Sequence, residues 1–289
     1  MQKMIGYLFD YIKNKNQLIL DGHCEEICSE LLTIAEKSST WIKKDTMLYR
    51  CQRGCDLKPL QIGTVGQPKP QDKFSWEPQP FGKERMTPWP DKAKEGRINP
   101  KGIPCLYLAK DELTAIQEMQ PLPNQLLTIA EFRATKDLRI VDCFGEINDN
   151  SNREDWFWTA FGYEFSRPML NSDDRADYAP TQYLASRFKS VGFHGIAYKS
   201  WFNQKLNYAI FRPDDFQFKF ESASVKRIVQ FPSLSEENIE EMKSNTSVLA
   251  EAELYGQVFR LQSNSFLLSG CEFIKESKNK EQEEKRKFV

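Results

Sequence analysis

Two charged residues stand at positions where their side chains could take part in chemistry. Glu118 follows Ala115 by three residues and precedes Met119, which places its carboxylate on the core-facing stripe of an expected helix. A carboxylate there must be paired or functional, unless it is a boundary glutamate that reaches solvent. Arg97 lies in a glycine-bracketed turn, 96–102, just before an expected strand. Such a turn suits a loop that grips an anion, although it can also be a plain turn.

Other polar residues near these two extend the list of candidates. Asn99 shares the turn with Arg97, and Arg50 lies on an expected strand as a second candidate anion ligand. Tyr107 alternates with two leucines, so it is either a core tyrosine or an aromatic surface for a ligand. Ser200 ends an expected strand, where its hydroxyl could donate a hydrogen bond to a ligand. Neither the dinucleotide fingerprint Gly-x-Gly-x-x-Gly nor the phosphate loop Gly-x4-Gly-Lys-Ser occurs, which excludes those two folds.

The composition predicts a folded, cytoplasmic protein without nucleic-acid or membrane partners. The 289 residues are 40% hydrophobic, which is enough for a sizeable core. Forty lysines and arginines balance 41 acids, so the net charge of −1 gives no electrostatic footprint for nucleic acid or acidic lipid. No stretch approaches the roughly 18 uncharged apolar residues of a membrane span, and the amino terminus meets an acid too early for a signal peptide.

The seven cysteines are expected to be reduced, because an odd number in a chain of this size does not resemble a disulfide framework. Two Cys-x3-Cys pairs, Cys24/Cys28 and Cys51/Cys55, raise a zinc site as an alternative. Cys24 and Cys28 also lie four residues apart on an expected apolar helix, which buried thiols explain equally well. We therefore expect no metal.

The elements that must position these residues are a mixture of strands and helices. Apolar spacing predicts two helices within residues 1–45, and residues 58–104, which hold nine of the fifteen prolines, are expected to be irregular. The rest of the central region predicts the strands 46–51, 104–109, 125–133, 195–199 and 206–211, one or two strands within 216–230, and the helices 111–119, 156–165 and 180–191. Strands and helices do not alternate strictly, so the fold class is α+β.

We divide the chain into four parts. Residues 1–45 form a helical N-terminal extension, and 46–231 form the catalytic domain. Residues 232–274 form a C-terminal appendage with a charged helix at 233–243 and an amphipathic stretch at 254–261. Residues 275–289, with ten charged residues in fifteen, are expected to be a disordered tail that is dispensable for chemistry.

Five ordered sequence blocks together resemble the RES-domain family over about residues 46–216. They are Gly96-Arg-Ile-Asn-Pro-Lys-Gly-Ile-Pro-Cys-Leu-Tyr-Leu-Ala109, then Thr114-Ala115 with Glu118, Tyr178-Ala-Pro-Thr-Gln-Tyr-Leu-Ala185, Gly192-Phe-His-Gly-Ile-Ala-Tyr-Lys-Ser200 and Asn207-Tyr-Ala-Ile-Phe211. The arginine, glutamate and serine that name the family match Arg97, Glu118 and Ser200, and Tyr107 also falls at the family's spacing. Gln120 and His194 depart from residues that are frequent in the family.

The resemblance implies a fold similar to ADP-ribosyltransferases, with a mixed-sheet core and helices, and an activity that consumes NAD as substrate. It implies Glu118 and Arg97 as catalytic residues and Arg97, Tyr107, Ser200, Arg50 and Asn99 as NAD contacts. Cleavage of the nicotinamide-ribose bond expels a neutral leaving group through an oxocarbenium-like state, so it needs negative charge and a grip on the diphosphate rather than a strong acid.

The expected function is therefore that of an NAD glycohydrolase or NAD phosphorylase, acting as a bacterial toxin or defence effector. The resemblance implies two partners, a cognate antitoxin or immunity protein and a second copy of the chain in a homodimer. The extensions at 1–45 and 220–289 lie outside the resemblance, so it does not show how they bear on these interfaces. Two alternatives stay open: a protein ADP-ribosyltransferase, and a catalytically inactive binding module. The residues do not decide whether water, phosphate or a protein accepts the ADP-ribosyl group.

Overall fold

The computed structural model describes residues 2–15, 19–62, 73–144, 153–166, 175–228 and 273–275. Its helices and short 3-10 turns are α1 (Gln2–Asn14), α2 (Gly22–Lys37), α3 (Lys83–Met86), η1 (Pro90–Lys92), α4 (Glu112–Glu118), α5 (Arg153–Ser166), η2 (Arg175–Tyr178), α6 (Ala179–Ser190) and η3 (Pro213–Asp215). Its strands are β1 (Ser39–Ile42), β2 (Met47–Arg53), β3 (Asp56–Ile62), β4 (Lys73–Gln79), β5 (Leu106–Ala109), β6 (Leu126–Ala134), β7 (Leu138–Asp142), β8 (Gly195–Lys199), β9 (Leu206–Ile210), β10 (Phe216–Ile228) and β11 (Phe273–Lys275).

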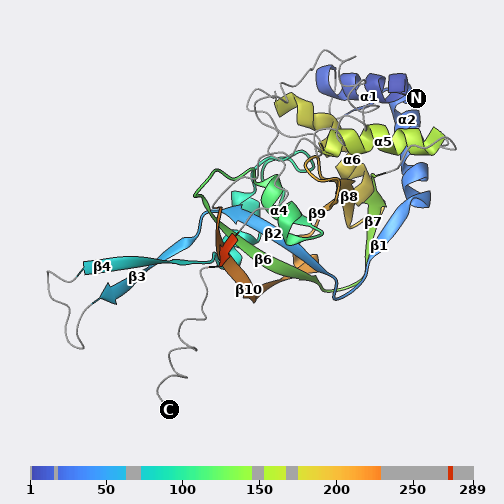
Figure 1. Ribbon diagram of the computed structural model, residues 1–289. Helices are drawn as coiled ribbons and strands as arrows, with labels where there is room; N and C mark the ends of the chain where they lie inside the picture. The colour runs from blue at the N-terminus through green and yellow to red at the C-terminus, as the bar shows by residue number, and fades with distance from the viewer. Residues whose placement is uncertain are drawn as a thin grey trace, which may run out of the picture.

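A nine-stranded mixed sheet forms the centre of the molecule (Figure 1). The strand order is β1-β7-β8-β9-β5-β2-β6-β10-β11. Only the β7–β8 pair is parallel among the described strands, and the other pairs are antiparallel. Helices and strands are interleaved without a βαβ repeat, so the prediction of an α+β fold with a mixed sheet is confirmed.

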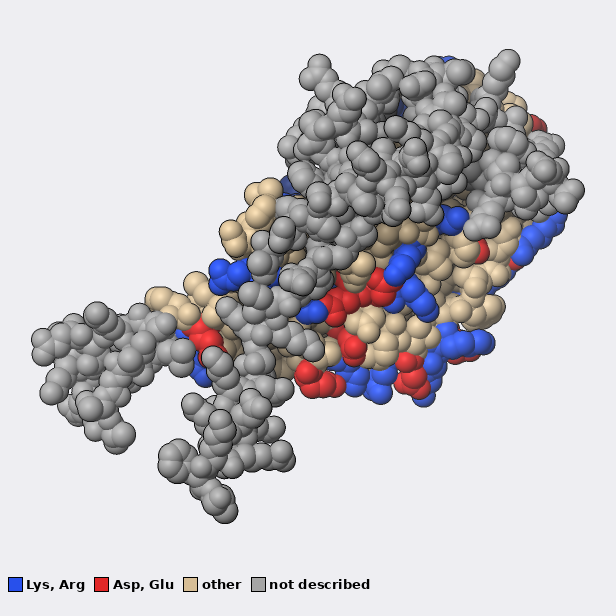
Figure 2. Space-filling view, in the orientation of Figure 1, with Lys and Arg blue, Asp and Glu red and all other residues tan. Residues whose placement is uncertain are grey.

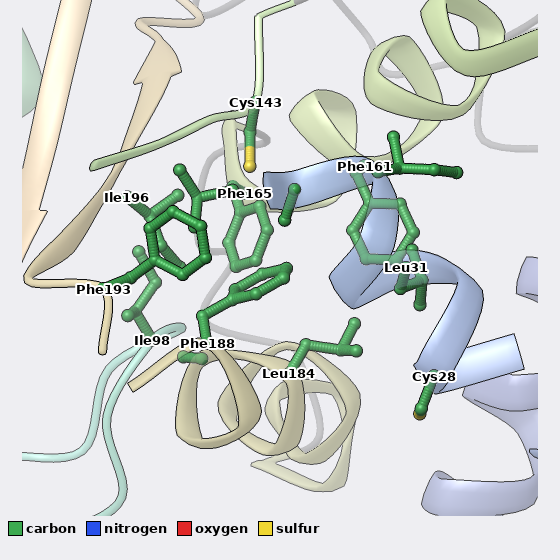
Figure 3. Packing of buried hydrophobic residues seen from close by; sticks show 14 of the residues in the cluster. Cys28, Leu31, Ile98, Cys143, Phe161, Phe165, Leu184, Phe188, Phe193 and Ile196 are labelled. Atoms are coloured by element: carbon green, nitrogen blue, oxygen red, sulfur yellow. The ribbon is translucent and has the colours of Figure 1, made fainter. Parts of the chain in front are cut away.

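The two N-terminal helices pack on the same core as α5 and α6. Leu8 and Ile12 of α1 and Leu31 of α2 are fully buried in this cluster, as the predicted helical spacing requires. Asp21 caps α2 by accepting a hydrogen bond from the backbone nitrogen of Cys24 at 2.8 Å. Figure 3 shows side chains from α2, α5 and α6 meeting over the sheet. The predicted helical pair is confirmed, and it shares its core with the central unit.

The expectation that residues 58–104 are irregular is wrong for two stretches, 58–62 and 73–79, which are strands. Residues of β3 and β4 form a two-stranded antiparallel hairpin that pairs Asp56 with Gln79 and projects from the body (Figure 1). Each strand of an isolated pair has an edge without a neighbouring strand, where a proline costs no ladder hydrogen bond. The prolines that favoured a loop prediction are therefore compatible with this hairpin. Pro59 lies opposite Trp76 in this register. Two further strands, β1 and β7, were not predicted, and they pair with each other.

The C-terminal predictions fall mostly outside the described residues. The expected helix at 233–243, the amphipathic stretch at 254–261 and residues 276–289 all lie there. The described segment β11 pairs antiparallel with β10, with Ile274 opposite Arg227. The domain boundaries at 45, 231 and 274 remain predictions.

The pairing of β11 predicts different effects for two C-terminal truncations. Removal of residues 276–289 leaves β11 whole, so we expect the melting temperature to be unchanged. Removal of residues 250–289 deletes β11 and exposes the backbone edge of β10, so we expect the melting temperature to fall by a few degrees. Thermal unfolding followed by circular dichroism measures both. An equal melting temperature for the two truncations would contradict the role of β11.

The surface charge of the visible face is mixed in sign. Lysine and arginine side chains are interspersed with aspartate and glutamate side chains over the described part of this face (Figure 2). Nucleic-acid-binding surfaces usually carry a continuous basic stripe instead. Among the described helices, none is both long enough and apolar enough to cross a membrane.

Candidate active site

The turn that carries Arg97 and Asn99 is held rigidly by the side chain of Asn99. The amide nitrogen of Asn99 donates to the backbone oxygens of Lys94, Pro100 and Ile103 at 2.9, 3.2 and 2.9 Å. Between Arg97 and Asn99, Ile98 is buried in the core beside Phe193 and Phe188 (Figure 3). The structure therefore gives the predicted NAD contact Asn99 a loop-shaping role, because its amide donors are used by the backbone.

Tyr107 on β5 ties this turn to the sheet. Its hydroxyl donates to the side-chain oxygen of Asn99 at 2.8 Å and accepts from the backbone nitrogen of Ile98 at 3.2 Å. A Cβ at Gly96 would lie only 2.7 Å from that hydroxyl, so this position requires glycine. Burial raises the pKa of Tyr107 well above its usual value, which keeps the phenol protonated and able to donate.

Arg97 is buried, and its guanidinium is held between two helical segments. One of its terminal nitrogens donates to the backbone oxygen of Glu164, near the C-terminal end of α5, at 3.1 Å. The guanidinium lies 5.3 Å from the ring centre of Tyr178. The hydroxyl of Thr181 at the start of α6 donates to the backbone oxygen of Arg97 at 2.6 Å. These contacts fix both the backbone and the side chain of Arg97.

Glu118 is the last residue of α4 and is oriented by two neutral donors. Asp111 begins the helix as predicted, accepting a hydrogen bond from the backbone nitrogen of Thr114 at 2.9 Å. At the other end, Ser200 Oγ and Asn207 Nδ2 donate to the same oxygen, Glu118 Oε1, at 2.6 and 2.7 Å. Burial raises the pKa of Glu118, and these two hydrogen bonds offset part of that rise. Its Oε2 takes no hydrogen bond from any residue that the structure describes.

Tyr198 connects the two groups of residues electrostatically. Burial raises its pKa, the negative charge of Glu118 raises it further, and the positive charge of Arg97 lowers it. Both charges therefore lie within electrostatic reach of the Tyr198 hydroxyl. Tyr107 is in electrostatic reach of Tyr198 and Arg97 as well. The structure thus brings Glu118, Ser200, Tyr107 and Arg97 into one region.

Arg50 on β2 meets this region from the backbone side of Tyr107. Its terminal nitrogen donates to the Tyr107 backbone oxygen at 3.2 Å. Its Nε is buried, and it has no hydrogen-bond partner among the described residues. Burial lowers the pKa of Arg50 to about 10, so the guanidinium stays charged at neutral pH. A half-buried guanidinium with an unused donor is suited to an anionic ligand.

Two residues of the site, Asn207 and Tyr198, were not singled out from the sequence. They lie opposite each other in the β8–β9 register. Asn207 is a buried amide in an otherwise apolar strand, which is a signal that it has a hydrogen-bond partner. Its partner, Glu118, lies 89 residues away in the chain, so the pairing could not be read from spacing.

The cysteine pairs considered for zinc belong to separate parts of the core. Cys24 and Cys28 are buried with α5 and α6, whereas Cys51 is buried with α4 and β6. Burial raises the pKa of Cys24 to about 11 and that of Cys51 to about 12, which favours the neutral thiols. In the described ranges, no three His, Cys, Asp or Glu side chains gather as a metal site would require.

Comparison with known proteins identifies the family. The family model described as "RES domain" matches residues 73–230, more than half of the chain. Among solved structures, the chain is similar to one from the Mycobacterium tuberculosis MbcT-MbcA toxin-antitoxin complex, with 12% identity and a TM-score of 0.35. That match covers 69% of this chain and 92% of the other. No curated protein matches significantly. From the extent of the family match, we conclude that this chain belongs to the RES-domain family.

Proposed function

We propose that the protein cleaves the nicotinamide-ribose bond of NAD, as an NAD glycohydrolase or NAD phosphorylase. The observation that carries the proposal is the geometry of Glu118. Two neutral donors fix one carboxylate oxygen, and the other is left without a partner among the described residues. A carboxylate held in this way supplies directed negative charge to a cation that develops during the reaction.

The reaction needs little from the protein besides placement and charge. The bond between ribose C1′ and the pyridinium nitrogen breaks with both electrons leaving on nicotinamide, which departs as a neutral molecule. The ribose is then oxocarbenium-like, and Glu118 Oε2 stabilises it or holds a ribose hydroxyl. Water or phosphate then attacks C1′. Raising the Glu118 pKa by burial does not prevent this role, because the charged form is supported by Ser200 and Asn207.

The two arginines are the proposed ligands for the NAD diphosphate. Arg97 is already fixed by Glu164 and Tyr178, and Arg50 has a buried donor without a partner among the described residues. Both are permanently charged at neutral pH and offer planar donors that match phosphate oxygens. We assign Tyr107 to holding the turn that carries Arg97, since its hydroxyl donates to Asn99. Ser200 acts through Glu118, to which its hydroxyl donates.

One incubation separates this proposal from its alternatives. Purified protein is mixed with NAD, with and without inorganic phosphate, and free nicotinamide is followed by chromatography. Release without phosphate supports hydrolysis, and release that requires phosphate supports phosphorolysis. When labelled NAD and a cell lysate are added, transfer of label to a lysate protein supports a protein ADP-ribosyltransferase. Absence of all three results would contradict the proposal and leave a binding module.

The biological setting follows from the substrate. Because NAD is shared by all metabolism, an enzyme that degrades it would be a toxin or defence effector in the cytoplasm, and its host would need an antitoxin or immunity protein. These partners, and a homodimer, are proposals that rest on family membership. Size-exclusion chromatography with light scattering tests the homodimer directly.

The hydrogen bond from Ser200 predicts a shift in pH dependence. This bond lowers the pKa of Glu118, so Ser200→Ala should raise that pKa further above its usual value. If the charged carboxylate is the active form, the acidic limb of kcat should move to higher pH in the variant. Turnover of NAD measured between about pH 4 and pH 8 checks this. An acidic limb at the wild-type position would remove Ser200 from the control of Glu118.

A further inference from the structure

A row of polar contacts joins helix α4 to the turn between β8 and β9. The turn runs from Ser200 to Lys205, and it contacts α4 at three levels. Lys205 Nζ lies 3.1 Å from Asp111 Oδ2, Asn203 Nδ2 donates to Thr114 and Gln117, and Ser200 donates to Glu118. Residues 111, 114 and 118 lie on one side of a helix, one turn apart. The contact that holds the proposed catalytic carboxylate is therefore the last of a series.

Asn203 is the central residue of this row, because both the nitrogen and the oxygen of its side-chain amide make hydrogen bonds. Its nitrogen donates to Thr114 Oγ1 at 2.9 Å and to Gln117 Oε1 at 2.5 Å. Its oxygen accepts from the backbone nitrogen of Lys205 at 3.0 Å, which closes the turn. Thr114 and Gln117 are both buried, so these contacts are shielded from water.

Bonds within the turn shape it as well: Gln204 N donates to Ser200 O at 3.0 Å, and Phe202 N donates to Ser200 Oγ at 3.3 Å. Its ends are joined by the bond from Ser200 N to Lys205 O at 2.7 Å. Gln204 has a positive φ of 59°, a conformation in which a residue other than glycine must be held by its surroundings. Gln204 is held by its bonds to Ser200 O, and the side chain of Asn203 links the turn to α4. A displacement of the turn would move Ser200 relative to Glu118, which it meets at 2.6 Å.

We propose that Asn203 is a positioning residue that sets the geometry of Ser200 and Glu118 by fastening the β8–β9 turn to α4. This inference rests on the proposed function, in which Glu118 stabilises the transition state. Asn203 does not touch the carboxylate, so its effect is indirect. A displacement of about 1 Å at a reacting group can cost about 100-fold in rate.

The test uses a double variant that separates positioning from stability. Asn203→Leu alone leaves Gln117 Oε1 buried without its donor, which destabilises the fold. Adding Gln117→Met removes that orphaned acceptor, and Thr114 keeps its bond to Asp111 at 2.9 Å. We expect the double variant to melt near the wild type, with kcat for NAD lower by about 10- to 100-fold and KM nearly unchanged. The control Lys205→Met removes a largely exposed ion pair between the same turn and helix, and should keep wild-type kcat.

A second readout is independent of turnover. With carboxyl-labelled glutamate, the NMR titration of Glu118 is identified by its loss in Glu118→Gln. The double variant should raise the pKa of Glu118, because the bond from Ser200 lowers it. A stable double variant with wild-type kcat, or with an unchanged Glu118 titration, overturns the inference. If the wild type has no turnover, the proposed function fails, and the titration alone decides the role of Asn203. Should the double variant not fold, Asn203→Ser is measured in its place, with the same expected results.

Discussion

Glu118→Gln is expected to lower the turnover of NAD by about 10²- to 10³-fold, because it removes one strong, directed charge from the transition state. The amide keeps an oxygen that can accept from Ser200 and Asn207, so the shape of the site is retained. Loss of charge is then the main change. Steady-state kinetics of nicotinamide release measures the effect, and kcat should fall more than KM rises.

The stability of the same variant gives an internal control with a defined sign. Burial raises the pKa of Glu118 in the folded state above its unfolded value. Ionisation therefore opposes folding, and this cost sets in as the pH rises from the unfolded to the folded pKa. At neutral pH, Glu118→Gln should melt at the wild-type temperature or above it. The matched control Glu26→Gln changes an exposed glutamate on α2 and should leave both turnover and melting unchanged. Wild-type turnover by Glu118→Gln would remove this carboxylate from the mechanism.

Secondary structure was predicted correctly where a short sequence pattern determines the helix by itself. The apolar stripe of α2, the Asp111 cap of α4 and the proline at the start of α6 each act within a few residues, and each element was predicted. The hairpin of β3 and β4 was missed because its prolines resemble loop residues, and only the pairing across the ribbon distinguishes them. The partner of a strand is a long-range property that spacing does not reveal.

The candidate site was predictable in its residue types and less so in its connections. Glu118 was found because a carboxylate on a core-facing stripe needs an explanation, and the structure supplies Ser200 and Asn207 as its partners. The NAD contact of Asn99 stays a prediction, and the structure shows its amide nitrogen donating to three backbone oxygens of its own loop. A short polar side chain in a turn serves the turn as readily as a ligand, and only coordinates separate the two uses.

Expression of the wild-type chain in bacteria is expected to stop growth and to lower cellular NAD, since central metabolism depends on this cofactor. Arg97→Ala should be tolerated, because it removes a proposed diphosphate ligand and also the contacts with Glu164 and Tyr178. Arg97→Lys should restore toxicity poorly. Its ammonium keeps the charge, but it cannot present two parallel donors to a phosphate or lie flat against the Tyr178 ring. Growth curves and an enzymatic assay of NAD in cell extracts measure these results.

Because Arg97 is buried, tolerance alone would not separate lost chemistry from lost folding, so each variant needs a measure of soluble protein and of its melting temperature. Arg187→Ala is the matched control, since this arginine of α6 pairs with Glu25 of α2 at 3.4 Å, at the partly exposed junction of the two helices. It should remain toxic. Arg97→Lys bears most directly on the mechanism, because it holds charge nearly constant and changes the donor geometry. A lysine variant as toxic as the wild type would show that charge alone suffices at this position, and steady NAD with normal growth on soluble wild-type protein would contradict the toxin proposal.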